Sequence, residues 1–198
     1  MMTRRAFWLC LASVLLISGC TGGDTDWHGK DISGLMPKLK FQLSNPEGQT
    51  VTAADSEGTI RLLYFGFTSC PDVCPTTLAK LEQAIRQLPE DEQEDITTLF
   101  VSVDPARDTP ERLASYVAFF GKNVVGLTGD EAVLRQLAKR YRTTFGYDEP
   151  DAQGNYNVSH SSAVYVFDQA GEPRLLLRPD LSARQVGEDL EQLVQTQN

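Results

Sequence analysis

The chain has 198 residues, of which 41% are hydrophobic and 23% charged, as is usual for a soluble globular protein with one domain of ordinary size. Its formal net charge is −9, so the chain lacks the excess of basic residues that would neutralise phosphates. This argues against a nucleic-acid partner.

The first residues have the pattern of an export signal. Two arginines precede an uncharged apolar run over residues 6–17, which is short for a membrane-spanning helix and ordinary for a signal peptide. The run ends in Leu-Ile-Ser-Gly-Cys at residues 16–20, which resembles the bacterial lipobox, in which the cysteine carries lipid. We therefore expect a lipoprotein signal peptide over residues 1–19, lipidation of Cys20, and attachment to the periplasmic face of a bacterial membrane. A plain secretory signal or a membrane anchor is the alternative.

Residues 20–36 show no clear hydrophobic period and are interpreted as a lipid-anchored tether, followed by a single domain over residues 37–198. His28 lies in this tether and is assigned no role.

Hydrophobic patterns in the domain predict strands that alternate with helices. Residues 38–43 alternate polar and apolar side chains and, with residues 49–53, indicate an N-terminal β-hairpin. Residues 60–67 are almost entirely apolar, as in a central strand that is covered on both faces. The later predicted elements are a helix from Pro75, a strand over 96–103, a helix after Thr109, a strand over 124–127, a helix from about 131, strands over 163–167 and 174–177, and a last helix from Ser182.

This order of elements is that of a thioredoxin-like α/β fold, with a central mixed β-sheet flanked by helices and an N-terminal β-hairpin extension. The turn-rich residues 142–159 form an inserted loop before the strand next to His160, and we expect it to be functional or a hairpin of its own. Right-handed crossovers place the strands over 60–67 and 96–103 side by side and parallel. Residues 70–75 then lie at the carboxyl end of a central strand, where open α/β sheets carry their sites.

Cys70 and Cys74 lie where the apolar strand ends and a helix begins. Each precedes a proline, and a residue before proline avoids the helical conformation, whereas Pro75 suits the first helical position. We therefore expect Cys74 at the helix N-cap, where the helix end favours a thiolate, and Cys70 in the loop before it. If Cys10 leaves with the signal and Cys20 carries lipid, these are the only remaining thiols. In an oxidising compartment such a pair is either a disulfide or kept reduced.

The segment Leu-Tyr-Phe-Gly-Phe-Thr-Ser-Cys-Pro-Asp-Val-Cys-Pro-Thr-Thr-Leu at residues 63–78 resembles the signature of the Sco/SenC family. The similarity continues through residues 31–37, 102–110 and 158–162. It implies a thioredoxin-fold copper chaperone that helps to metallate the binuclear copper site of cytochrome c oxidase. By the same resemblance the copper ligands are Cys70, Cys74 and His160. The implied partners are the copper-site subunit of the oxidase and other periplasmic copper chaperones.

The residue types agree with that ligand set. Two thiolates and one imidazole suit copper and make a three-coordinate Cu(I) site reasonable, although the resting oxidation state, Cu(I) or Cu(II), stays open. A structural zinc site normally takes four protein ligands, and the sequence offers no obvious fourth. In a thioredoxin-like fold the loop that enters the strand over 163–167 packs against the cysteines, so His160 can reach both. Asp72 has no decided role, and turn formation or helix capping accounts for Asp104 and Asp108.

A thiol–disulfide oxidoreductase is the second hypothesis. It would use Cys70 and Cys74 as catalytic thiols to reduce the cysteines of the oxidase copper site. Three residues separate the two cysteines, whereas thioredoxin-like oxidoreductases use Cys-x-x-Cys. A disulfide needs Cβ atoms about 3.5–4.5 Å apart, and two metal–sulfur bonds of about 2.3 Å span more. The longer spacing favours a bridging metal without excluding a disulfide, and a redox sensor is the third hypothesis.

Overall fold

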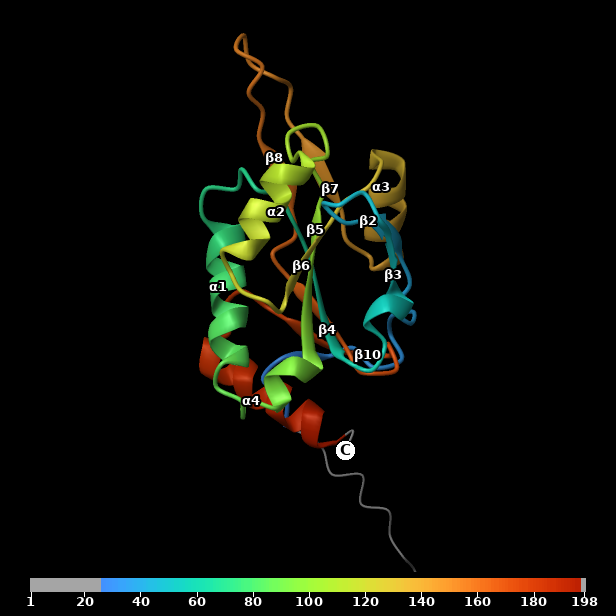
Figure 1. Ribbon diagram of the computed structural model, residues 1–198, viewed down its shortest axis with the longest axis vertical. Coiled ribbons are helices and arrows are strands. Elements are labelled where there is room, and N and C mark those ends of the chain that lie inside the picture. The colour runs from blue at the N-terminus through green and yellow to red at the C-terminus, as the bar shows by residue number, and fades with distance from the viewer. Residues whose placement is uncertain (1–25, 197–198) are drawn as a thin grey trace, which may run out of the picture.

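The computed structural model describes residues 26–196 (Figure 1). The expected signal peptide over residues 1–19, the expected lipidation site Cys20 and the start of the tether lie outside the described residues. Within residues 26–196, every helix is too short or too polar to cross a membrane.

A six-stranded mixed sheet forms the centre of the domain, in the order β1-β10-β9-β4-β5-β6. Its strands are β1 (Lys30–Asp31), β4 (Ile60–Gly66), β5 (Ile96–Ser102), β6 (Val124–Leu127), β9 (Val164–Phe167) and β10 (Pro173–Leu177). Strands β4, β5 and β6 are parallel neighbours, whereas β9 pairs with β4 in the antiparallel sense. All seven residues of β4 are buried, which confirms the central strand that its apolar run predicted.

Four helices cover the two faces of this sheet. They are α1 (Val73–Ile85), α2 (Pro110–Ala118), α3 (Glu131–Arg140) and α4 (Ala183–Gln195), and two short 3-10 turns, η1 (Ala53–Ser56) and η2 (Glu92–Asp95), precede β4 and β5. Figure 1 shows α1, α2 and α4 on one side of the sheet and α3 on the other. Right-handed crossovers from β4 to β5 and from β5 to β6 advance in one direction, so α1 and α2 cover the same face. The predicted thioredoxin-like architecture is confirmed.

The predicted N-terminal hairpin is present but shorter than expected. It consists of β2 (Gln42–Ser44) and β3 (Thr50–Thr52), and it lies on the same side of the sheet as α3 (Figure 1). Residues 38–41 do not join its ladder, because the Leu39 N–H donates to the Gly171 carbonyl and the Lys40 N–H donates to the Tyr141 hydroxyl. Leu39 and Phe41 are nevertheless buried, so the alternating pattern identified the inward side chains and misassigned the backbone partners.

The interpretation of residues 20–36 as a tether is wrong for its later part. Lys30–Asp31 form β1 at the edge of the sheet, and the N–H groups of His28 and Gly29 donate to the carboxylate of Asp189 at 2.9 and 2.8 Å. The Asp189 side chain lies on α4 and its residue is 1% exposed. Residues 28–31 show no hydrophobic period, and a buried carboxylate on a distant helix holds them. A local sequence pattern cannot predict such a contact. His28 itself is paired with Glu188.

Residues 142–159 include a hairpin of their own, as the turn-rich pattern allowed. It is formed by β7 (Phe145–Tyr147) and β8 (Val158–His160), which pair in antiparallel register with Phe145 opposite His160. The connecting loop projects away from the domain at the top of Figure 1. The base of this hairpin lies at the carboxyl ends of β4 and β5, the edge of the sheet at which the two cysteines are found.

Candidate metal centre

Cys74 lies in the first turn of α1, and Cys70 lies in the loop between β4 and α1. The helix begins at Val73 with Asp72 as its N-cap, so the predicted N-cap at Cys74 is wrong by two residues. Pro75 is the third helical residue. The first four N–H groups of a helix have no partner within it, so proline is tolerated there and Cys74 can adopt the helical conformation.

Gly66 makes room for the Cys74 side chain. A Cβ atom at Gly66 would lie 2.9 Å from the Cys74 sulfur and 2.6 Å from the Phe100 ring, closer than real Cβ contacts. The absence of a side chain at the end of β4 therefore lets the first turn of α1 pack directly on the strand. Cys74 is consequently 0% exposed and belongs to the hydrophobic core.

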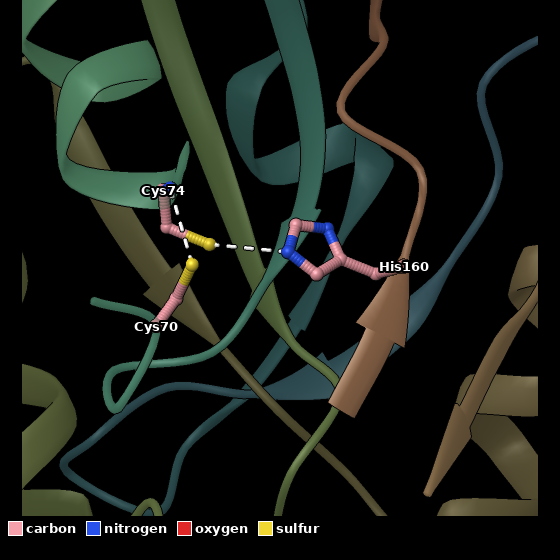
Figure 2. A group of neighbouring side chains, drawn as sticks. All are labelled: Cys70, Cys74 and His160. Atoms are coloured by element: carbon pink, nitrogen blue, oxygen red, sulfur yellow. Dashed lines mark hydrogen bonds between the residues drawn. The ribbon is translucent and has the colours of Figure 1, made fainter. Parts of the chain in front are cut away.

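The two thiols lie next to each other and both are free (Figure 2). The Cys74 N–H donates to the Cys70 sulfur over 3.4 Å, which holds Cys70 against the start of the helix. Cys70 is 9% exposed and is the thiol nearer to solvent.

His160, at the end of β8, directs its imidazole at the thiols (Figure 2). Its Nε2 lies 3.4 Å from the Cys74 sulfur, and its Nδ1 lies 2.9 Å from the carbonyl oxygen of Ser161. A carbonyl only accepts, so Nδ1 carries the hydrogen and a neutral ring presents the lone pair of Nε2 to the sulfur. Burial lowers the pKa of His160, which favours this neutral form. The Phe67 ring packs edge-on against the imidazole at 5.6 Å between centroids.

The ligand atoms of Cys70, Cys74 and His160 all lie within 4.8 Å of one another. This confirms the predicted proximity of the histidine to both thiols. Among residues 26–196, these three form the one group of histidine, cysteine and acidic side chains with metal-binding geometry.

Burial dominates the electrostatics of Cys74. It raises the pKa of this thiol to about 12, and the nearby Phe67 backbone and Tyr64 side chain lower it only in part. The expectation that the helix start would favour a thiolate is therefore outweighed, because a buried anion costs more than a helix end returns. A cation bound at the sulfur would supply the missing stabilisation.

Asp108 fixes the loop that carries Cys70. The residue is 2% exposed, and its carboxylate accepts hydrogen bonds from the N–H and hydroxyl of Thr68, at 2.9 and 2.6 Å, and from the hydroxyl of Ser102. Arg112 donates to the Thr68 hydroxyl from the other side. The cap of α2 is Thr109, so the capping role considered for Asp108 is wrong. Asp108 instead joins the loop before Cys70 to the end of β5.

Asp104 fixes the hairpin that carries His160. Its buried carboxylate pairs with Arg107 and accepts a hydrogen bond from the Tyr156 hydroxyl at 2.6 Å. The Arg107 guanidinium stacks on the Tyr156 ring at 3.8 Å and donates to the Tyr156 carbonyl. Tyr156 precedes β8 by two residues, so this network positions the strand that ends at His160. It shows a use for Asp104 beyond turn formation.

Asp72 is exposed, and within residues 26–196 its carboxylate accepts a hydrogen bond from the Thr76 hydroxyl alone, at 3.3 Å. It takes no part in the cluster. A cleft of about 380 Å³ opens over the cluster, and its lining includes Cys70, His160, Val73, Arg107 and Tyr156. The site is thus closed on the Cys74 side and accessible from the Cys70 side.

Comparison with known proteins agrees with this arrangement. Residues 35–195 match the SCO1/SenC family model. An SCO2-like protein of Rickettsia typhi is 35% identical over 154 residues, which cover 76% of this chain and 74% of the relative.

Solved structures resemble the fold over most of the domain. Apo Sco1 from Thermus thermophilus is 35% identical, with a TM-score of 0.74 over 86% of this chain and 99% of that chain. Copper-bound ScoI from Bradyrhizobium japonicum is 30% identical, with a TM-score of 0.70 over 79% of this chain and 98% of that chain. With a family model that spans nearly the whole described domain and relatives of this identity, the chain belongs to the SCO1/SenC family.

Proposed function

We propose that this protein binds one copper ion through Cys70, Cys74 and His160 and acts as a metallochaperone in the assembly of the copper site of cytochrome c oxidase. The observation that carries the proposal is the convergence of two sulfurs and one imidazole nitrogen within 4.8 Å. The copper-bound ScoI structure, to which this chain is similar, supports the choice of metal.

The donor set fits copper better than the other common metals. Soft thiolates select Cu(I), zinc or iron–sulfur clusters, and a structural zinc site takes four protein ligands. The cluster offers three. Donor bonds of about 2.0–2.3 Å around a trigonal ion place the ligand atoms roughly 4 Å apart. Atoms that already lie within 4.8 Å need only a small adjustment to reach that spacing.

The shape of the site suits a metal that is passed on. Cys74 is enclosed by the core, whereas Cys70 and His160 line the cleft, so a partner can approach the ion from one side only. Exposed Val73, at the mouth of this cleft, offers an apolar contact beside the ligands. We take the partners to be the copper-site subunit of the oxidase and a periplasmic copper chaperone that loads the site.

The proposal includes the N-terminal segment. Removal of residues 1–19 and lipidation of Cys20 would hold the domain at the periplasmic face of a bacterial membrane, where the copper site of the oxidase is assembled. A Cys20→Ser variant should move from the membrane fraction to the soluble periplasmic fraction. Retention of this variant in the membrane would show that the lipid is not what holds the protein there.

A Cu(I) titration against a competing chelator tests the ligand set. The reduced parent should bind one ion, and Cys70→Ser, Cys74→Ser and His160→Ala should each weaken binding at least about 10-fold. His28→Ala is the matched control, because His28 is the other histidine of the chain and pairs with Glu188 away from the cluster. Equal binding by His160→Ala and His28→Ala would show that the imidazole is not a ligand.

Thiol–disulfide exchange is the second candidate function, and the adjacency of the two free thiols favours it. The more exposed Cys70 would attack a partner disulfide, and Cys74 would then displace the partner's thiol. The partner gains two electrons and two protons, and a Cys70–Cys74 disulfide forms. Reduction of a peptide disulfide by His160→Ala at the parental rate would support this function independently of copper.

A further inference from the structure

Two tyrosine hydroxyls are buried beside the thiols without a well-formed hydrogen bond to any residue in the described part of the chain. They belong to Tyr64 on β4 and Tyr116 on α2. Tyr64 is 0% exposed. Buried hydroxyls are nearly always paired in native proteins, because an unpaired one loses its bond to water without replacement. A buried hydroxyl that makes no well-formed hydrogen bond beside a candidate metal centre is therefore expected to have an acceptor when the metal is bound.

Two side chains, those of Cys74 and Thr77, lie within reach of the Tyr64 hydroxyl. Burial raises the pKa of Tyr64 first and Cys74 raises it next, whereas the Thr77 side chain lowers it. Cys74 is therefore placed to accept from the Tyr64 hydroxyl, and Thr77 is placed to donate to it. The Tyr64 ring also meets the His160 ring edge-on at 6.1 Å. Tyr64 thus borders two of the three proposed ligands from beneath the site.

Tyr116 lies on α2 and is separated from Tyr64 by the ring of Phe100. Its ring packs on Phe100 at 5.3 Å, and Phe100 packs on Tyr64 at 6.0 Å. Burial, followed by Cys74 and Cys70, raises the pKa of Tyr116. Its position makes it the weaker of the two candidate donors.

Copper binding would make the Cys74 sulfur a better acceptor. A neutral thiol accepts hydrogen bonds weakly, whereas a ligating sulfur is a thiolate, and hydrogen bonds to charged acceptors are the stronger kind. Hydrogen bonding around a ligating cysteine sulfur is one of the factors that tune the reduction potential of copper sites.

We propose that the Tyr64 hydroxyl donates a hydrogen bond to the Cys74 sulfur when that sulfur is a copper-bound thiolate, and so strengthens copper binding and favours Cu(I) over Cu(II). The proposal rests on the proposed function, because it requires copper on Cys74. Tyr64 is a positioning residue that acts through its ligand. A hydrogen bond withdraws electron density from sulfur, and the more electron-rich Cu(I) thiolate gains more from it than the Cu(II) thiolate.

Tyr64→Phe in the full chain tests the inference, with Tyr165→Phe as the matched control. Tyr165 is a buried tyrosine on the adjacent strand β9, and its hydroxyl interacts with Thr143. We expect Tyr64→Phe to weaken Cu(I) binding about 10-fold, to lower the copper reduction potential and to shift the sulfur-to-Cu(II) charge-transfer band to longer wavelength. Tyr116→Phe should shift the band less, in the same direction, and Tyr165→Phe should leave it unchanged.

The melting temperature of the copper-free protein distinguishes a role of Tyr64 in copper binding from a role in packing of the core. Because the Tyr64 hydroxyl makes no well-formed hydrogen bond in the copper-free protein, Tyr64→Phe should leave the melting temperature of that protein nearly unchanged. The variant should lose only the extra stability that copper adds. A parent that binds copper and a Tyr64→Phe variant with the parental band, potential and affinity would overturn the inference and leave the proposed function intact. A parent that binds no copper would overturn the proposed function, and this inference with it.

Discussion

The cysteines and the histidine reach the same site from regions of different construction. Cys74 lies on a helix packed against β4, every residue of which is buried, and both elements belong to the central core. His160 ends a short two-stranded hairpin outside the central sheet. The cysteines therefore depend on local sequence and core packing, whereas the histidine depends on polar side chains that hold the hairpin to the domain. Variants in the two regions should fail in different ways.

Asp108→Ala should have the largest effect, on the cysteine side. It leaves the N–H and hydroxyl of Thr68 and the hydroxyl of Ser102 without their buried acceptor. We expect a loss of about 3 kcal/mol in the free energy of unfolding of the copper-free protein, measured by chemical denaturation. Asp130→Ala is the control, because Asp130 is exposed and its side chain makes no capping bond. Equal losses in the two variants would contradict the role given to Asp108.

Gly66→Ala should come next and acts on the contact between β4 and α1. The added methyl group meets the Cys74 sulfur and the Phe100 ring, both held in the core. Overpacking of this kind costs about 1–3 kcal/mol in stability, and we expect copper binding to weaken because Cys74 must shift. Gly129→Ala should cost less, because its new methyl would lie 3.2 Å from the end of the Leu43 side chain and 4.0 Å from that of Val133. Parental copper affinity in Gly66→Ala would show that Cys74 is not held by this contact.

Tyr156→Phe should have the smallest effect on global stability and should act on the histidine side. It removes the hydrogen bond to buried Asp104 and keeps the ring on which Arg107 stacks. We expect a loss of about 1 kcal/mol in stability, with faster amide hydrogen exchange confined to β7 and β8. Unchanged exchange in the hairpin, or faster exchange throughout the sheet, would contradict the local role given to Tyr156.

The difference between the two regions also explains which features could be predicted from sequence. The central strand and the thiols at its end follow from the apolar run over residues 60–67 and the prolines after Cys70 and Cys74, which are local signals. The start of α1 is misplaced by two residues because the first helical turn tolerates Pro75 as its third residue.

The long-range features carry weaker local signals. His160 was assigned through resemblance to a family and through the packing expected of a thioredoxin-like fold. No local pattern around it marks a ligand, since its approach to Cys74 depends on a hairpin held by Asp104, Arg107 and Tyr156. The packing of residues 28–31 depends on Asp189, which is buried on the last helix. The role of Asp108 was missed for a similar reason, because its partner Thr68 lies 40 positions earlier in the chain.

X-ray absorption of the Cu(I)-loaded protein tests most directly that both regions supply ligands to one ion. We predict a copper ion with two sulfur neighbours at about 2.3 Å and one nitrogen neighbour at about 2.0 Å. The nitrogen should disappear in His160→Ala and persist in His28→Ala. A shell of sulfur alone in the parent, or a nitrogen that persists in His160→Ala, would contradict a site built from Cys70, Cys74 and His160.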